Sequence, residues 1–345
     1  PILPYLDKIL LHGVGEAFLH PNIHKYLNLY AKYGVEVSCV TNMTHMDKDL
    51  AAVIGDTFKS ITISCDGATK ETFESIRRGI SFEEFCENIR MLHELQPTLE
   101  LRFNVVCMRQ NIVEMPKIME LASELGISAV GISGLIAQKV LDNLEDEIKL
   151  YPKVASFYLK EAVNRANELG IQLLQIPGYV YNLDSNMTFE EELTMMNQKP
   201  FYHSVQFQKG LYERYRKMDV IKPTEQADLN HYAVESNYSC NGICDYIVES
   251  PFVGVNGDIT TCCIDGIHII GNLNNNTFVE IWNNAVYQKL RNMFFKSKIP
   301  KFCVGCMFLK DHTNVKRILL DKIYSDFLDH EFSDLLDLSD CEDKI

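Results

Sequence analysis

The sequence has no long apolar run. Its longest apolar stretches, such as residues 248–255, are short and interrupted, whereas a helix that crosses a bilayer needs about 20 apolar residues. Residues 1–4 (PILP) provide neither the basic start nor the apolar stretch of a secretory signal peptide. These two absences predict a cytoplasmic protein without a membrane partner.

Positive charge is also scarce. The chain has 33 Lys and Arg against 47 Asp and Glu, which gives a formal net charge of −14. Because proteins hold a phosphate backbone mainly through Lys and Arg, we expect no nucleic-acid partner. Eleven cysteines without a secretory signal favour thiols or metal ligands in a reducing compartment over a disulfide scaffold.

The first 137 residues alternate between two periodicities. Short runs rich in β-branched residues predict strands, and the stretches between them have the apolar spacing of amphipathic helices. Gly34, Gly126 and Gly170 stand where such helices would end, because glycine tolerates the left-handed conformation common there. Strands that alternate with helices indicate βαβ units and a parallel sheet. The predicted strands are 8–11, 35–40, 60–64, 99–106 and 129–132.

Later residues follow other patterns, which divide the chain into four predicted parts. Residues 1–137 form the α/β part described above. Residues 138–238 are mostly helical to about 175 and then irregular, and we interpret them as an insertion that covers another part of the protein. Residues 239–312 hold six cysteines and many turn residues. Residues 313–345 are acidic and are typical of a solvated helix with a frayed end.

Four cysteines in the third part form the strongest candidate site. Cys244 and Cys262 are separated by 17 residues, and Cys303 and Cys306 form a CxxC motif further on. Thiolates are soft ligands, so two such pairs suit either zinc or an iron–sulfur cluster, and their spacing does not choose between the two. A hairpin that turns at residues 256–258 is expected to lead to Cys262. The alternative ligands are Cys240 and Cys263.

Polar residues or glycines stand at the ends of several predicted strands. Gly13, Gly15 and Glu16 follow the first strand, where glycine lets a ligand approach the backbone and a carboxylate suits a cationic amine. Asp66 suits a ribose diol, because a carboxylate accepts hydrogen bonds from both hydroxyls. Each residue alone is explained as well by a helix cap or a turn, but parallel α/β folds bind ligands at the carboxyl ends of their strands. The whole set predicts a ligand site and also includes Thr41, Asn42, Ser64, Asn104, Gly131 and Ile132.

Two parts of the sequence resemble radical S-adenosylmethionine (SAM) enzymes that carry a C-terminal SPASM or twitch-type auxiliary cluster domain. Residues 13–21 (GVGEAFLHP) are similar to the family's GGEP segment, with Ala17 in place of its proline. Residues 64–79 resemble its ribose-side strand and the helix after it, and residues 130–134 resemble its adenine-side strand. The segments that resemble the SPASM pattern are 255–263, 271–273, 280–283 and 300–306.

The resemblance implies a partial (β/α)6 TIM-like barrel without its first βα unit, followed by a small cysteine-rich domain with a β-hairpin and a helix. It implies SAM, one auxiliary 4Fe-4S cluster for electron transfer or substrate binding, and an electron donor such as flavodoxin or ferredoxin. A 5′-deoxyadenosyl radical would abstract hydrogen from a peptide or a small sugar-like substrate. Glu16, helped by Gly15, would bind the methionine amino group. The other residues would lie near the polar groups (Thr41, Asn42, Ser64), the ribose (Asp66) and the adenine (Gly131, Ile132) of SAM.

One motif of this family is absent from the 345 residues. The family's CxxxCxxC motif holds the cluster that cleaves SAM, and Cys39, Cys65, Cys86 and Cys107 do not have that spacing. We therefore expect a truncated form that does not cleave SAM alone, its second 4Fe-4S cluster belonging to a missing N-terminal segment. The alternative is a non-catalytic binding protein with a structural zinc or iron–sulfur site and a degenerate SAM pocket.

Overall fold

The computed structural model describes residues 3–13, 15–135, 146–177, 185–198, 235–239, 250–254, 256–261 and 269–300, together with Cys244, Ile247 and Cys303. The chain divides into two compact units, Pro1–Leu211 and Tyr212–Ile345. Each unit has its own hydrophobic core among the described residues. Each is therefore a separate packing unit with its own candidate site.

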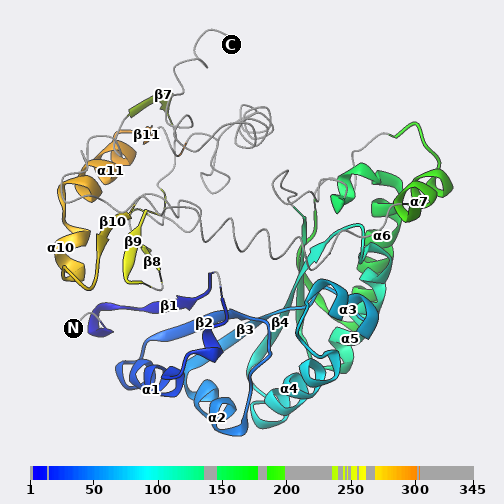
Figure 1. The fold of residues 1–345 in the computed structure, drawn as a ribbon, viewed down its shortest axis with the longest axis horizontal. Coiled ribbons are helices and arrows are strands. Elements are labelled where there is room, and N and C mark those ends of the chain that lie inside the picture. The colour runs from blue at the N-terminus through cyan, green and yellow to red at the C-terminus, as the bar shows by residue number, and fades with distance from the viewer. Residues whose placement is uncertain are drawn as a thin grey trace. The chain divides into compact units, whose positions relative to one another are not determined.

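The first unit is built on a six-stranded parallel sheet (Figure 1). The strands follow one another in chain order across the sheet, and every neighbouring pair is parallel. The predicted α/β fold with a parallel sheet is thereby confirmed. The strands are β1 (Lys8–Leu11), β2 (Glu36–Thr41), β3 (Phe58–Ser64), β4 (Glu100–Cys107), β5 (Ala129–Gly134) and β6 (Gln172–Gln175).

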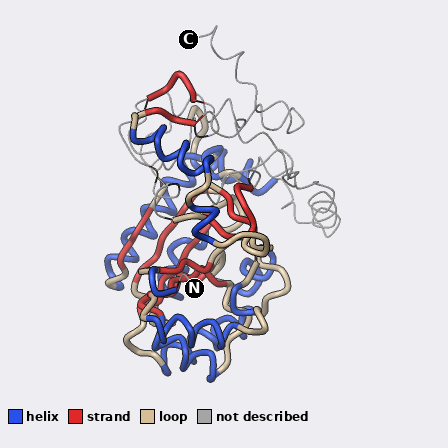
Figure 2. Tube along the Cα trace, turned by 90° about the vertical axis from the view of Figure 1, so that its left-hand side faces the viewer, coloured by secondary structure: helices blue, strands red, loops and turns tan. Residues whose placement is uncertain are grey.

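Helices connect successive strands, and α1, α2, α4 and α5 lie along one face of the sheet (Figures 1 and 2). Gly34 and Gly170 end two of the helices in the left-handed conformation, at φ 68° and 71°, as their sequence positions predict. The helices are α1 (Ile23–Tyr33), α2 (Lys48–Thr57), α3 (Lys70–Ile76), α4 (Phe82–Leu95), α5 (Met115–Glu124), α6 (Pro152–Leu169) and α7 (Phe189–Gln198). The short 3-10 helices are η1 (Leu3–Tyr5), η2 (Ala17–Leu19), η3 (Ile112–Glu114) and η6 (Ile148–Leu150).

The two faces of the sheet differ in polarity. On β3, Ile61 and Ile63 are fully buried toward the helices, whereas Thr62 between them is partly exposed on the other side. On β4, the buried Phe103 alternates in the same way with the partly exposed Asn104. Side chains of a strand alternate between its faces, so the face opposite the helices is polar. We call it the inner face of the sheet, and its members on β3 and β4 include Ser60, Thr62, Ser64, Arg102 and Asn104.

One stretch differs from its sequence-based prediction. Helix α7 lies within residues 177–238, which are predicted to be irregular, whereas β6 follows Gly170, where a helix is predicted to stop and a strand to begin. Helix α7 is stabilised by contacts that no local pattern reports. Glu192 is fully buried, and its Oε2 accepts hydrogen bonds from the first N–H groups of α6, those of Lys153 at 2.7 Å and Val154 at 3.1 Å.

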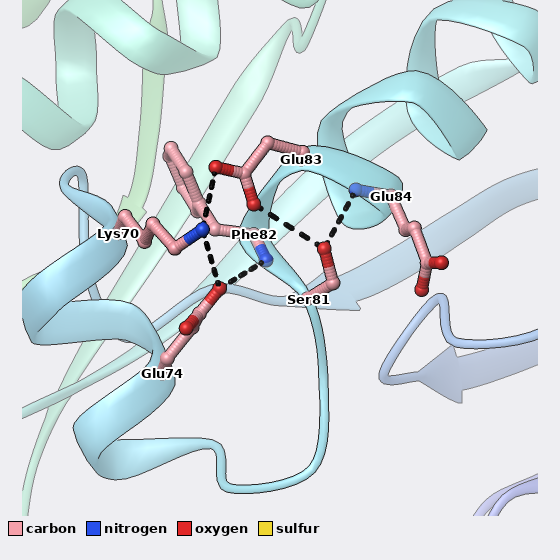
Figure 3. A network of polar contacts seen from close by, with 6 residues as sticks. All are labelled: Lys70, Glu74, Ser81, Phe82, Glu83 and Glu84. Atoms are coloured by element: carbon pink, nitrogen blue, oxygen red, sulfur yellow. Dashed lines mark hydrogen bonds and ion pairs between the residues drawn. The ribbon is translucent and has the colours of Figure 1, made fainter.

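A polar network fixes the connection between α3 and α4 (Figure 3). Lys70 on α3 pairs with Glu83 on α4 at 2.9 Å, and the N–H of Phe82 donates to Glu74 Oε1 at 3.1 Å. Ser81 caps α4 by accepting the N–H of Glu84 at 3.3 Å. Exposed ion pairs contribute little each, so the network mainly sets where α4 begins.

The strands described in the second unit are paired antiparallel. Strands β8 (Phe252–Val253), β9 (Asp258–Thr260) and β10 (Ile269–Asn272) form one sheet, and β7 (Glu235–Ser239) pairs with β11 (Lys298–Pro300). Helices α10 (Phe278–Trp282) and α11 (Ala285–Phe295) also belong to the described part of this unit. The predicted hairpin is confirmed: the N–H of Gly254 donates to Asp258 O at 2.7 Å, and Gly257 turns the chain at φ 81°. Among the helices described in either unit, none has the length and apolar character needed to span a membrane.

Candidate functional site

Glu16 lies just after β1, and its carboxylate contacts the end of β2. Its Oε1 accepts hydrogen bonds from Thr41 Oγ1 at 2.9 Å and from the N–H of Phe18 at 3.2 Å, while its Oε2 accepts the N–H of Asn42 at 2.6 Å. A carboxylate has about four acceptor positions, so these contacts leave Oε2 room for one more donor. Gly15 precedes Glu16 at φ 129°, a conformation that favours glycine.

The end of β2 is held in a strained conformation that orients Asn42. Met43 is a buried non-glycine residue at φ 60°, a conformation that costs on the order of 1 kcal/mol. Its N–H donates to Thr41 Oγ1 at 3.0 Å, and its carbonyl accepts from Asn88 Nδ2 at 2.9 Å. Asn42 Oδ1 in turn accepts the N–H of Thr44 at 3.0 Å. These bonds maintain the bend that aims the Asn42 N–H at Glu16.

Three of the predicted site residues form one row across the inner face. Ser64 on β3 is in register with Asn104 on β4, and Asn104 is in register with Gly131 on β5. A Cβ added to Gly131 would lie 3.9 Å from Phe103 O and 4.0 Å from Asn104 Oδ1, which is ordinary contact. Packing therefore does not require glycine at 131, and the missing side chain leaves a flat surface beside the Asn104 amide.

Asp66 follows β3 at the same end of the sheet, but its carboxylate is already engaged. Its Oδ1 accepts the N–H of Val106 at 2.8 Å, and its Oδ2 pairs with Arg77 at 2.7 Å. Burial raises the pKa of Asp66, and Arg77 and the Val106 N–H counteract that rise. The ribose role stays a prediction, and these contacts favour a structural one in which Asp66 joins β4 to α3.

Ile132 takes a different position from its neighbour Gly131. Its side chain is fully buried in the core of the first unit, on the helix side of β5. Only its backbone is available to a ligand on the inner face.

The four cysteines of the first unit are core residues. Cys39, Cys65, Cys86 and Cys107 are all buried and lie in one hydrophobic cluster. Burial raises the pKa of Cys86 to about 11 and raises the pKa values of the other three further. Burial in that cluster gives these thiols a packing role, and their spacing is not that of the CxxxCxxC motif.

The second unit brings two of the predicted ligands into one cluster. Cys244 and Cys303 are 8% and 9% exposed and belong to the same hydrophobic core, although 58 residues separate them. The other two, Cys262 and Cys306, lie outside the described residues, as do the alternatives Cys240 and Cys263. No group of three or more potential metal ligands occurs within the described part of the chain.

Two sequence profiles match this chain. Residues 4–122 match the Radical SAM superfamily, and residues 244–307 match SPASM, an iron–sulfur cluster-binding domain. The chain therefore carries a Radical SAM domain and a SPASM domain. The first match includes Glu16, Ser64 and Asn104, and the second includes Cys244 and Cys303. The buried thiol pair fits an iron–sulfur cluster, and the description of the matching domain favours that cluster over zinc.

A curated relative of this chain is the GTP 3′,8-cyclase of Chlorobaculum tepidum. The two are 31% identical over 120 residues, which are 34% of this chain and 36% of that enzyme. The alignment thus spans about a third of the relative's length, and it does not bring the relative's reaction to this chain.

Solved structures share the fold. Native anSMEcpe with bound AdoMet has a TM-score of 0.50 and 14% identity, over 99% of this chain and 87% of that one. SuiB of Streptococcus suis bound to precursor peptide SuiA has a TM-score of 0.49 and 12% identity, over 82% of this chain and 55% of that one. At 14% identity the likeness to native anSMEcpe concerns the fold alone, and it agrees with the α/β fold predicted from the sequence.

Sequence analysis missed a carboxylate that supports the site. Glu114 is 7% exposed, and its Oε2 accepts the N–H of Ala68 at 2.8 Å. Its Oε1 accepts the hydroxyls of Thr69 and Thr72, both at 2.7 Å. Glu114 therefore fixes the loop between β3 and α3 that carries Asp66. Its partners are more than 40 residues away in sequence, so no local pattern could have identified it.

Proposed function

We propose that this protein is a radical SAM oxidoreductase whose first unit binds SAM on the inner face of its sheet and whose second unit holds one auxiliary 4Fe-4S cluster. The proposal rests mainly on Glu16, a carboxylate fixed between the ends of β1 and β2 with an acceptor position left on Oε2. An ammonium group is the donor that suits such a position, and SAM carries one on its methionine moiety.

The row across the inner face supports the rest of this binding mode. Ser64 and Asn104 offer a hydroxyl and an amide, and Gly131 offers a flat surface on which an adenine ring can lie. Thr41 and Asn42 hold Glu16 in place and are assigned to orienting it. SAM reduced by one electron would release methionine and supply a 5′-deoxyadenosyl radical, and that radical would abstract a hydrogen atom from the substrate. The protein's own part is to orient SAM and to exclude water.

The auxiliary cluster is assigned to Cys244, Cys262, Cys303 and Cys306, with Cys240 or Cys263 as alternatives. Two of the four already share a buried core, where thiolates are shielded from water. Its proposed role is to transfer an electron or to hold the substrate. The proposed substrate is a peptide or a small sugar-like molecule, and the proposed electron donor is a flavodoxin or a ferredoxin.

Anaerobic reconstitution with iron and sulfide tests the cluster assignment. We expect the wild-type chain to take up four irons and to show a broad visible absorbance band, and Cys303→Ser to lose both. Cys86→Ala is the matched control, because Cys86 is a core thiol of the other unit, and it should keep the cluster. Zinc uptake without the visible band, or a Cys303→Ser variant with unchanged iron content, would contradict the assignment.

A second candidate is a non-catalytic protein that binds SAM or a peptide and uses its metal for structure. The observation in its favour is the absence of a CxxxCxxC motif from the 345 residues. The two candidates differ in whether the protein, once supplied with every cluster it can bind and a reductant, forms 5′-deoxyadenosine from SAM.

A further inference from the structure

Helix α11 carries two residues, one turn apart, that contact the segments next to the cysteines. Tyr287 is fully buried, and its hydroxyl donates to the carbonyl oxygen of Thr260 at 3.3 Å. Thr260 ends β9 and stands two residues before Cys262. Tyr287 therefore holds the end of the strand that leads to this proposed ligand.

Arg291 makes the corresponding contact to the segment that begins at Cys244. Its Nε donates to the carbonyl oxygen of Ile247 at 3.3 Å. The N–H of Ile247 donates in turn to the carbonyl oxygen of Cys244 at 3.1 Å, which closes a turn. One guanidinium thus stabilises the turn that presents Cys244.

Aromatic rings fix the plane of that guanidinium. Its carbon lies 3.9 Å from the centre of the Trp282 ring and 5.0 Å from that of Tyr287, and the two rings are 4.9 Å apart. The Phe278 ring stacks on the Trp282 ring, with the two ring centres 5.6 Å apart. Stacking of this kind restricts an arginine to one orientation. The guanidinium is therefore held in place before any metal binds.

The same guanidinium has an unsatisfied hydrogen-bond donor. Its Nη2 is buried and has no hydrogen-bond partner among the described residues. Burial lowers the pKa of Arg291, but an arginine side chain remains protonated in proteins. A buried donor without an acceptor is uncommon in folded proteins and calls for an explanation. An anionic centre ligated by thiolates would provide the missing acceptor.

We propose that Arg291 is a positioning residue of the C-terminal iron–sulfur site, which holds the Cys244 turn through Nε and offers its Nη2 and its positive charge to the thiolate-ligated cluster. Tyr287 completes the arrangement by holding the strand that leads to Cys262. The inference rests on the proposed auxiliary cluster. Hydrogen bonds and positive charge near cluster sulfurs raise the reduction potential of a cluster, so this arrangement also tunes electron transfer.

Four variants of the reconstituted chain test this inference. Arg291→Met removes the charge and the donors, Arg291→Lys keeps the charge but loses the planar guanidinium with its Nε and Nη2 donors, and Tyr287→Phe removes one hydroxyl. Lys289→Met is the matched control, because Lys289 is an exposed cation on the same helix. The measurements are iron content, the reduction potential from a mediator titration followed by visible absorbance, the rate of iron loss to a chelator, and fluorescence of the single tryptophan.

The expected results differ among the variants. In Arg291→Met, the ratio of reduced to oxidised cluster should be about tenfold lower at a fixed solution potential, and iron should be lost faster. In Arg291→Lys, both the ratio and the rate of iron loss should lie between those of Arg291→Met and the wild type. Tyr287→Phe should shed iron faster with a potential near that of the wild type. Lys289→Met should match the wild type throughout. Trp282 fluorescence should change in the Arg291 variants, because their side chain lies on its ring.

Two outcomes overturn the inference. An Arg291→Met variant that keeps both the wild-type potential and the wild-type rate of iron loss shows that Arg291 does not act on the cluster. If Arg291→Met does not fold, Arg291→Lys decides, and a Lys variant equal to the wild type in both measurements excludes a role for Nη2. A wild-type chain that binds no iron at all contradicts the proposed function instead, so the two failures are distinguishable.

Discussion

Replacing Glu16 with glutamine tests the proposed SAM site most directly. The carboxylate accepts from Thr41 Oγ1, from the Phe18 N–H and from the Asn42 N–H. An amide has one oxygen, so its NH2 group must face one of the two N–H donors whichever way it turns. Because Glu16 is partly exposed, the unsatisfied N–H should cost about 1 kcal/mol of unfolding free energy, the low end for such groups.

The effect on SAM should be larger than the effect on folding. A hydrogen bond to a charged group contributes about 1.5–3 kcal/mol, and about 1.4 kcal/mol is a tenfold change in affinity. Glu16→Gln should therefore weaken SAM binding by roughly 10- to 100-fold in equilibrium dialysis of the whole chain. Glu100→Gln is the control, because it makes the same chemical change at the first residue of β4, where Glu100 pairs with Arg102. This variant should bind SAM as the wild type does.

The refuting result is specific. If Glu16→Gln binds SAM with wild-type affinity while its unfolding free energy falls as expected, Glu16 is a structural residue of the β1–β2 connection. If the wild type itself shows no measurable affinity for SAM, the inner face is not the SAM site of this chain. Urea unfolding of all three proteins provides the stability values for this comparison.

Three further predictions follow from the same structure. The raised pKa of Asp66 means that its ionised form destabilises the fold, a cost that is absent at low pH and grows as the pH rises through the folded pKa. Arg77 limits this cost, so Arg77→Met should lose more unfolding free energy in urea at pH 7 than at pH 4.5. An equal loss at both pH values would contradict the Asp66–Arg77 pairing. Gly131→Leu should keep the wild-type melting temperature within a few degrees yet weaken SAM binding at least tenfold in dialysis. An unchanged affinity would show that adenine does not bind beside Gly131. A protein of these 345 residues alone should form no 5′-deoxyadenosine from SAM under dithionite, and its detection by chromatography would show that the SAM-cleaving cluster needs no CxxxCxxC motif.

Several features of the fold could be predicted because their causes are local. Alternation of β-branched runs with helical spacing reports which residues face a core, and the strand at 8–11 is found at its predicted bounds. Gly257 and Asp258 predict the hairpin because only certain residues fit its turn. Gly15 and Glu16 follow a strand, but each alone fits a plain turn equally well, so only the whole set of strand-end residues and the family resemblance predict a ligand site there.

The sequence by itself determined the parallel sheet, the cysteine-rich unit and most of the residue types at the candidate site. Only the tertiary structure decided which partner each carboxylate has. Glu16 contacts a strand 25 residues away, Asp66 bonds a strand 40 residues away, and Glu114 reaches back more than 40 residues. Periodicity reports the burial of a side chain but carries no information about strand register, and register is what places Ser64, Asn104 and Gly131 in one row.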